Sequence, residues 1–450
     1  MNAWVLRFYS LVMRLAQPFL RRKLARRAKL EPGYGVAVEE RFGFYAQPAE
    51  KSPELVWVHA VSLGETRTAA ILIQAMRSQI PGLRVLLTHG TATGRAEGAG
   101  LLQPGDVQVW QPWDTPAGVA RFFDHFKPRL GLLMETEVWP CTVAEAKARG
   151  LPLVLVNARL SEKSLQQALR ISALSYPAFA ALGAVYAQTA DDARRFRQLG
   201  VDVAGVFGNL KFDATPSHSQ QILGKQWRGG LQQPVVMFAS SREGEEIEFF
   251  RCIGNVVQQV RLPSAINSIA IDATPSISLA ARTLLVPRHP QRFDEVAALA
   301  EQHGLTVSRR SSWPAAGPAG DALAMAADVW LGDSLGEMAL YYAMSDVALL
   351  GGSFAPLGGQ NLIEAASCGC PVVMGPHTFN FAEAASQAEA GGAASRVAGM
   401  PEGVQLALQI AADSPRHAAT VAASLAFAGA NRGATARTLD ALQPFLLPAL

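Results

Sequence analysis

Carboxylates stand at the ends of two apolar runs, where a parallel sheet could bring them together. Glu65 closely follows the run Leu55 to Ala60 and opens a helical pattern, while Glu135 and Glu137 follow the run Leu130 to Met134. Because open α/β sheets build their active sites at the carboxyl ends of strands, we expect these side chains to share one cleft. The alternative for Glu65 is purely structural, since the helix dipole favours a carboxylate in the first turn.

Glycine-rich turns in the second half of the chain are typical of phosphate sites. Their backbone N–H groups and the positive end of a helix can approach a phosphate closely. Glu364 lies three residues after Asn361 on the same helix face, where its carboxylate could bind ribose hydroxyls. The turns therefore predict a nucleotide pocket, although none matches a dinucleotide or P-loop pattern and each could serve geometry alone. They are Gly332-Asp333-Ser334-Leu335-Gly336-Glu337, Gly351-Gly352-Ser353-Phe354 and Gly358-Gly359-Gln360-Asn361.

Basic residues stand at two further strand ends. Arg288 and His289 follow the apolar run Thr283 to Val286, and Lys211 lies near the expected junction of the two halves. These cations could converge on a phosphate. The ordinary alternative is that Arg288 and Lys211 are surface charges.

Short β-rich runs alternate with helical patterns along the whole chain. This alternation is typical of parallel sheets covered by helices on both faces, so we expect two doubly wound, Rossmann-like α/β domains. The expected strands of the first half are Leu55 to Ala60, Arg84 to Thr88, Val107 to Trp110, Leu130 to Met134, Leu153 to Val156, Ala184 to Ala187 and Val203 to Phe207. Those of the second half are Val235 to Ala239, Thr283 to Val286, Thr306 to Ser308, Val329 to Leu331, Val347 to Leu350 and Pro371 to Met374.

Composition fits a globular two-domain protein. The chain has 450 residues, 49% of them hydrophobic and 17% charged, which is too apolar for a disordered protein and too long for one ordinary core. Its four cysteines are too few and too irregularly spaced for a disulfide framework or a structural zinc site. Cys368 and Cys370 are expected to be packed small residues, and a redox pair is the alternative.

The first 30 residues carry the unusual charge of the chain. They contain eight basic residues and no acidic one, and because the whole chain carries +3, the remainder carries −5. A narrow polar stripe of Arg7, Ser10, Arg14, Gln17 and Arg21 recurs at helical spacing on an otherwise apolar segment. The apolar part is too short and too charged to span a bilayer, so we expect an in-plane anchor on anionic lipid. The alternative is an ordinary core helix.

These patterns together divide the chain into five expected parts. The stretch between the two halves contains Pro216, Gly224, Gly229 and Gly230, which favours a linker. The Ala/Ser/Ile-rich stretch Ala265 to Ala280 is expected to be a surface insertion. The parts are the anchor (1–30), a first Rossmann-like domain (31–212), the linker (213–233), a second Rossmann-like domain (234–430) and a helical tail (431–450).

Six stretches resemble the 3-deoxy-D-manno-octulosonic acid (Kdo) transferases and occur in the family's order between about residue 30 and about residue 385. They are His59-Ala60-Val61-Ser62-Leu63-Gly64-Glu65, Glu135-Thr136-Glu137-Val138-Trp139-Pro140, Asn157-Ala158-Arg159-Leu160-Ser161, Gly208-Asn209-Leu210-Lys211-Phe212-Asp213, Val286-Pro287-Arg288-His289-Pro290 and Gly358-Gly359-Gln360-Asn361-Leu362-Ile363-Glu364.

The resemblance implies the GT-B glycosyltransferase fold and Kdo transfer from CMP-Kdo to a lipid A precursor in lipopolysaccharide synthesis. It also implies that residues 31–212 bind the acceptor and residues 234–430 bind the CMP-sugar donor. It implies no cofactor and no metal, and the absence of an Asp-x-Asp triplet agrees with that expectation. The expected location is the cytoplasmic side of the inner membrane, on anionic lipid, and no nucleic-acid partner is expected.

The resemblance also implies roles for individual residues. Glu65 resembles the general base, and Glu135 and Lys211 resemble residues that stabilise the transition state of an inverting displacement. Whether Glu135 or Glu137 matters more stays open, because alternation along a continued strand would turn only one of them to the cleft. Residues that resemble CMP contacts are Arg288, His289, Leu335, Gly336, Glu337, Asn361, Leu362, Ile363 and Glu364.

Two other functions remain compatible with parts of the pattern. A nucleotide-sugar epimerase of the same architecture would share the cleft and the glycines but would not need the basic apolar segment. A non-catalytic scaffold at the membrane surface would leave Glu65 and the second carboxylate cluster without a purpose.

Overall fold

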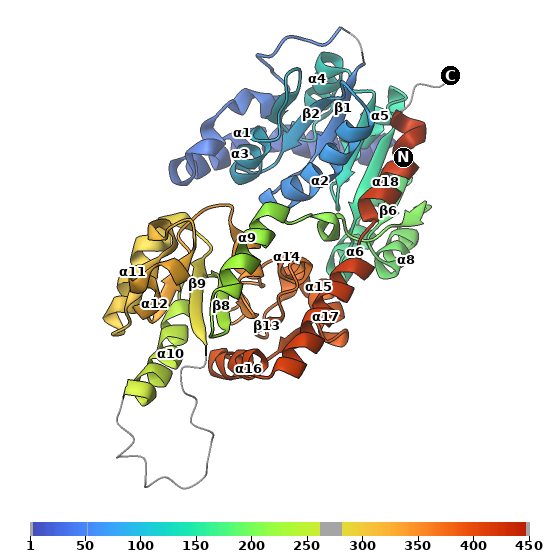
Figure 1. Cartoon of the computed structure of the whole chain (residues 1–450). Helices are drawn as coiled ribbons and strands as arrows, with labels where there is room; N and C mark the ends of the chain where they lie inside the picture. The colour runs from blue at the N-terminus through green and yellow to red at the C-terminus, as the bar shows by residue number, and fades with distance from the viewer. Residues whose placement is uncertain (1–2, 52, 262–280, 447–450) are drawn as a thin grey trace. The chain divides into compact units, whose positions relative to one another are not determined.

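The computed structural model describes residues 3–51, 53–261 and 281–446. They form two compact units, one of residues 3–213 with 431–446 and one of residues 214–430. In Figure 1 the first unit runs from blue to green and also contains the red C-terminal helix, and the second runs from green through yellow to red. The expected surface insertion, Ala265 to Ala280, lies outside the described residues.

The first unit is a parallel sheet of seven strands in the order β3-β2-β1-β4-β5-β6-β7. Its strands are β1 (Leu55–His59), β2 (Arg84–His89), β3 (Val107–Trp110), β4 (Leu130–Met134), β5 (Leu153–Ala158), β6 (Ala184–Ala187) and β7 (Gly205–Val206). The helices are α1 (Ala3–Leu30), α2 (Leu63–Gln79), α3 (Ala92–Ala99), α4 (Pro116–Phe126), α5 (Pro140–Ala148), α6 (Glu162–Arg170), α7 (Ser172–Phe179), α8 (Ala190–Gln198) and α18 (Ala434–Leu446), with 3₁₀ turns η1 (Pro32–Gly35), η2 (Val38–Phe42) and η3 (Leu210–Asp213).

The core of this unit explains its continuous apolar strands. Every residue of β1 is buried, as expected for a parallel strand covered on both faces. Trp57 is fully buried, packs edge-on against Phe122 and Phe123, and donates its indole N–H to the Thr88 hydroxyl at 2.8 Å. The neighbouring strand carries Gly131 beside this indole, because a larger residue would not fit.

Gly131→Ala should destabilise the first unit. An added Cβ would lie 2.4 Å from Leu153 Cδ2 and 2.8 Å from Trp57 Cε3, so the packed core would have to shift. Overpacking of this kind costs about 1–3 kcal/mol in the free energy of unfolding. Denaturant unfolding measures the effect. Gly100→Ala is the matched control, since its Cβ would meet nothing closer than 3.5 Å, and equal stability of both variants would contradict the packing argument.

The second unit repeats this architecture with seven parallel strands in the order β10-β11-β9-β8-β12-β13-β14. Its strands are β8 (Val235–Ser241), β9 (Arg282–Pro287), β10 (Val307–Arg309), β11 (Val329–Leu331), β12 (Val347–Leu350), β13 (Val372–Met374) and β14 (Ala394–Arg396). The helices are α9 (His218–Gly229), α10 (Glu245–Arg261), α11 (Phe293–Gln302), α12 (Ala322–Ala326), α13 (Met338–Ala343), α14 (Leu362–Ser367), α15 (Ala382–Ala390), α16 (Met400–Ala412) and α17 (Ser414–Ala430), with 3₁₀ turns η5 (Pro290–Arg292), η6 (Arg310–Ser312), η7 (Pro318–Gly320) and η8 (Phe379–Phe381). The two doubly wound sheets confirm the expected fold class.

The stretch expected to be a linker, 213–233, instead contains helix α9, which packs against α13. Gly224 explains the error. A Cβ at this position would lie 2.4 Å from Leu340 O and 2.8 Å from Ala343 Cβ, so the glycine serves close helix packing rather than flexibility.

The C-terminal helix α18 belongs to the first unit. It lies beside α2 in Figure 1, and Tyr186 donates its hydroxyl proton to Ala441 O at 2.8 Å. Asp213 accepts hydrogen bonds from Gly433 N at 2.6 Å and Thr435 N at 2.5 Å. The residues expected to form a helical tail therefore complete the core of the first unit.

Helix α1 turns many of its large apolar side chains away from the protein. Leu6 and Tyr9 pack against the first unit, and Ser10 is buried with its hydroxyl donating to Leu6 O at 2.6 Å. Ser10 of the expected polar stripe thus faces the protein rather than water. The exposed residues include Trp4, Phe8, Leu11, Val12, Leu15 and Phe19. Among the described residues, no helix is long and apolar enough to span a bilayer.

Candidate functional site

Glu65 lies in the first turn of α2 and closes a reciprocal cap with Ser62. The Ser62 hydroxyl oxygen accepts a hydrogen bond from Glu65 N at 3.3 Å and donates its own proton to Glu65 Oε1 at 3.0 Å. Glu65 Oε2 accepts from Val61 N at 2.8 Å. This arrangement resembles a capping box and fixes the turn into α2, so the structural role considered for Glu65 is real. It also fixes the carboxylate at the carboxyl end of β1.

The surroundings of the Glu65 carboxyl group also raise its pKa. Its pKa is raised to about 7, first by burial and then by the neighbouring charges of Glu135 and Glu137, against hydrogen bonds from Val61 and Ser62 that lower it. A carboxylate with a pKa near neutrality is suited to take a proton from a hydroxyl group.

Two buried histidines support the backbone next to Glu65. His59 Nδ1 lies 2.9 Å from Thr88 Oγ1, and His89 Nδ1 lies 3.0 Å from Ala60 O. Burial lowers the pKa of His59 to about 3 and that of His89 to about 4, so both rings are neutral near pH 7. They pack and position the strand ends.

The sequence left open whether Glu135 and Glu137 alternate along a continuation of the strand. In the structure they do not, because the strand ends before them. Strand β4 ends at Met134, and Glu135 has a left-handed backbone with φ of 57°. Such a conformation is costly for a residue with a side chain and is often found at functional sites. Glu137 accepts the indole N–H of Trp139 at 3.0 Å, and burial raises its pKa. Because these residues lie in a turn and not in a strand, the charges of both carboxylates raise the pKa of Glu65.

Lys211 reaches the same cluster from η3. Its Nζ lies 3.6 Å from Glu135 Oε1. Asn157, which has a positive φ of 52° at the end of β5, accepts Leu210 N at 3.0 Å, and Asn209 Oδ1 accepts Lys211 N at 3.0 Å. The structure thus brings together Glu65 and Glu135, as expected from their places at strand ends. It pairs Lys211 with this carboxylate cluster, whereas the sequence grouped Lys211 with Arg288 and His289 as possible phosphate ligands.

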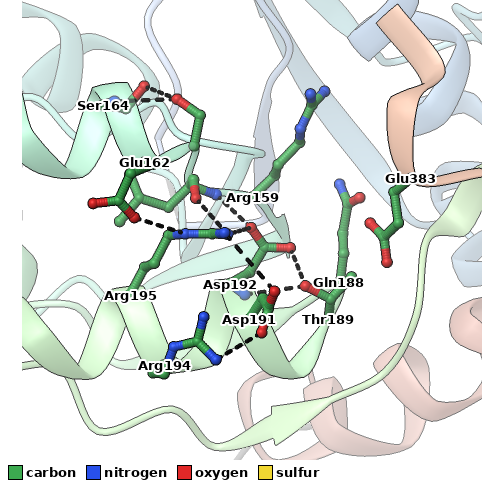
Figure 2. Close-up of polar contacts among 12 residues, drawn as sticks. Arg159, Glu162, Ser164, Gln188, Thr189, Asp191, Asp192, Arg194, Arg195 and Glu383 are labelled. Atoms are coloured by element: carbon green, nitrogen blue, oxygen red, sulfur yellow. Dashed lines mark hydrogen bonds and ion pairs between the residues drawn. The ribbon is translucent and has the colours of Figure 1, made fainter. Parts of the chain in front are cut away.

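A network of polar side chains holds the loop that follows β5 (Figure 2). Asp192 accepts Leu160 N at 2.8 Å, and Arg195 donates to Leu160 O at 3.1 Å. Arg159 N donates to Glu135 O at 3.2 Å, while the exposed guanidinium of Arg159 points away from the network in Figure 2. The network therefore holds the backbone of Arg159 and Leu160, and Arg159 is hydrogen-bonded to Glu135.

In the second unit, Arg288 and His289 follow β9, as expected. Arg288 N donates to Ser241 O at 3.0 Å, which joins them to the end of β8. The pKa of His289 is lowered, first by burial and then by Arg242, Arg288 and Arg292. Arg242 was not among the residues predicted from the sequence, although its place directly after the strand β8 could have revealed it. These residues form a positive cluster suited to a phosphate.

The Gly351-Gly352-Ser353 turn corrects the expectation that its N–H groups bind phosphate. Buried Glu245 accepts Gly352 N at 2.8 Å and both Phe354 N and Ala355 N at 3.1 Å. A Cβ at Gly351 would lie 2.1 Å from Ser240 O. Close backbone approach therefore explains this turn, and an internal carboxylate occupies its donors.

The remaining residues expected to contact the nucleotide differ in how exposed they are. Leu335 is 74% exposed and Gly336 has φ of 76°, whereas Leu362 and Ile363 are buried at 1% exposure. The side chains of the last two face the core, so only their backbone could touch a ligand. Glu337, Asn361 and Glu364 are partly buried; Glu337 Oε1 accepts from Arg310 at 3.0 Å, and Asn361 caps α14 by accepting Ile363 N at 3.1 Å.

Possible metal ligands and the thiols bear on two expectations from the sequence. Within residues 3–51, 53–261 and 281–446, no three His, Cys, Asp or Glu side chains are grouped to hold a metal ion. The metal-free reaction stays a prediction. Cys368 and Cys370 are buried free thiols, and burial raises the pKa of Cys368 to about 12, which disfavours the redox alternative.

Comparison with known proteins points to one family. The family described as 3-deoxy-D-manno-octulosonic-acid transferase (kdotransferase) matches residues 37–214. The 3-deoxy-D-manno-octulosonic acid transferase of Bordetella pertussis is 44% identical over 97% of this chain and 99% of its own length. That of Haemophilus influenzae is 29% identical over 98% of both chains.

Solved structures share the fold at low sequence identity. UDP-GlcNAc 2-epimerase from Neisseria meningitidis aligns with a TM-score of 0.54 at 14% identity, over 87% of this chain and all of its own. A glycosyltransferase from Rickettsia africae aligns with a TM-score of 0.52 at 10% identity, over 89% of this chain and all of its own. At these identities the likeness is one of architecture.

Proposed function

The chain belongs to the 3-deoxy-D-manno-octulosonic acid (Kdo) transferase family, and we propose that Glu65 is the general base of its reaction. It is a glycosyltransferase of the GT-B fold that transfers Kdo in lipopolysaccharide synthesis. The donor is CMP-Kdo and the acceptor is a lipid A precursor. The observation that carries the assignment of the base is the Glu65 carboxyl, with its pKa of about 7, beside Glu135.

The acceptor half of the reaction uses the carboxylate cluster. Glu65 takes the proton of the acceptor hydroxyl as its oxygen attacks the anomeric carbon of Kdo. The bond from that carbon to the CMP phosphate oxygen breaks, and the configuration inverts in this single displacement. Lys211, held 3.6 Å from Glu135, supplies positive charge where negative charge develops. Glu135 orients Lys211 through this ion pair.

The donor half of the reaction needs a site for the single phosphate of CMP. We assign this role to Arg288, His289 and Arg242, which lie at adjoining strand ends of the second unit. A phosphate monoester leaves with less charge than a diphosphate, so fixed cations and N–H groups could replace a divalent metal. Asn361 and Glu364 are proposed contacts of the nucleoside, together with Leu335, Gly336 and Glu337.

Transfer from CMP-Kdo to a tetra-acylated lipid A precursor, in detergent and with a chelator, tests this function. Mass spectrometry should show the acceptor gaining one or more Kdo units, and CMP should appear in equal amount. Conversion of UDP-GlcNAc without any Kdo transfer would instead favour the epimerase reaction of the structural neighbours. A requirement for a divalent cation would overturn the metal-free mechanism.

We also propose that α1 lies in the membrane surface. Its exposed side chains include Trp4 at 75%, Phe8 and Phe19 at 69% and Leu15 at 66% exposure, which is unusual for a helix bathed in water. Lysines and arginines follow along the same helix, where they can meet anionic lipid heads. An in-plane helix would hold the enzyme at the surface that carries its lipid acceptor.

Replacing Phe8, Leu15 and Phe19 with serine should weaken binding to anionic vesicles about tenfold or more, because each loses apolar burial in the lipid. Vesicle sedimentation measures the change. The matched control replaces Leu323 and Leu425, which are 80% and 50% exposed in the second unit, with serine. Equal vesicle binding by the two variants would contradict the membrane role of α1.

A further inference from the structure

An apolar cavity of about 340 Å³ lies in the first unit beside the carboxylate cluster. Its walls come from α1 through Tyr9, from the segment 136–140 that follows β4, and from α6 and α7. The volume falls in the range of small-ligand pockets, roughly 300–1,000 Å³.

Three polar groups of the cavity wall are engaged within the protein. The Thr136 hydroxyl donates to Arg159 O at 2.6 Å, and the Ser175 hydroxyl donates to Ala168 O at 2.7 Å. Tyr9 is hydrogen-bonded to the buried carboxyl of Asp114. Most of the other lining residues are apolar: Val138, Trp139, Pro140, Leu160, Ala168, Ile171, Leu174, Ala178 and Phe179.

The position of the cavity links the site to the lipid surface. Thr136 lies between Glu135 and Glu137, and Tyr9 packs from α1 against the core of the first unit, next in sequence to Phe8, which is 69% exposed. Trp139 and Ile171, at 38% and 57% exposure, also line it. The cavity lining thus includes both exposed apolar side chains and the residue between Glu135 and Glu137.

We propose that this cavity binds one acyl chain of the acceptor lipid. The inference rests on the proposed function, which supplies a lipid acceptor. The chain would enter past Ile171 and Trp139, leaving the sugar of the same molecule near Glu65. Trp139 donates its indole N–H to Glu137 at 3.0 Å, so a bound chain also steadies that carboxylate. The cavity therefore selects acylated over deacylated acceptors.

Ala168→Trp, which fills the cavity from α6, tests this inference in the full-length enzyme. The KM for a tetra-acylated acceptor should rise about tenfold or more, since several methylenes lose their apolar site at about fourfold each. The KM for a deacylated acceptor and the KM for CMP-Kdo should not change. Ala173→Trp is the matched control, because Ala173 is exposed on α7 and does not line the cavity.

A second variant and a labelling experiment keep the test decisive if Ala168→Trp does not fold. Ile171→Ser changes an exposed residue and should raise the same KM by a smaller factor. A tetra-acylated acceptor with a diazirine at one chain end should crosslink to the segment 160–179. Crosslinks confined to α1, or an unchanged KM in both variants, would overturn the inference. Failure of the unmodified enzyme to transfer Kdo to any acceptor would instead overturn the proposed function.

Discussion

Glu65→Gln should lower kcat by roughly 10²–10⁴-fold, the usual contribution of a general base. Glutamine has the shape of glutamate, its amide oxygen can still accept from Val61 N, and Ser62 still caps α2 by accepting the backbone N–H of residue 65. It cannot take a proton from the acceptor hydroxyl. Steady-state transfer from CMP-Kdo measures the loss, and calorimetry should show unchanged CMP binding.

The control for this variant is Glu97→Gln, which removes a carboxylate of the same unit that is paired with Arg67 at 2.8 Å on the surface. It should keep the full rate. If Glu65→Gln also keeps its rate while folding normally, Glu65 serves only as a helix cap and the base must be sought elsewhere.

Lys211→Met should lower kcat by roughly 10²–10³-fold, the range found when one charge-stabilising group is removed. Methionine keeps much of the side-chain volume but removes the cation and leaves Glu135 without the partner 3.6 Å away. The KM for CMP-Kdo should change much less than kcat, because the charge acts where negative charge develops. Rapid-quench kinetics separates these effects.

A double-mutant cycle tests whether Lys211 and Glu135 act together. If they form one functional pair, adding Glu135→Gln to Lys211→Met should cost little more than the single change. Lys147→Met, an exposed charge change on α5, provides the control. Full additivity of the two losses would show that the pair does not act as a unit.

The sequence predicted most of the sheet architecture because long apolar runs must be buried on both faces of a parallel sheet. Strands such as Val107–Trp110 and Leu130–Met134 lie where periodicity put them. The short strand β14, Ala394–Arg396, was missed because three residues of mixed polarity carry no period. Helix α9 was missed because Gly224 serves helix packing, a tertiary reason that local propensity does not express.

The candidate site was predicted unevenly for similar reasons. Glu65, Glu135 and Lys211 could be found from their positions at strand ends and from the family resemblance. The left-handed backbone conformation of Glu135 could not be predicted, because the turn depends on backbone hydrogen bonds to Val156 and Arg159. Glu245 was also beyond reach, since its N–H donors come from a loop more than 100 residues away.

The pH dependence of kcat/KM tests the role of Glu65 most directly. The base must be deprotonated, and its pKa is raised to about 7, so kcat/KM should fall about tenfold per pH unit below that value and level off above it. The residual activity of Glu65→Gln should lack this inflection, which distinguishes the ionisation of Glu65 from that of other groups in the enzyme or the substrates. A flat profile in the unmodified enzyme, or the same inflection in Glu65→Gln, would contradict the assignment.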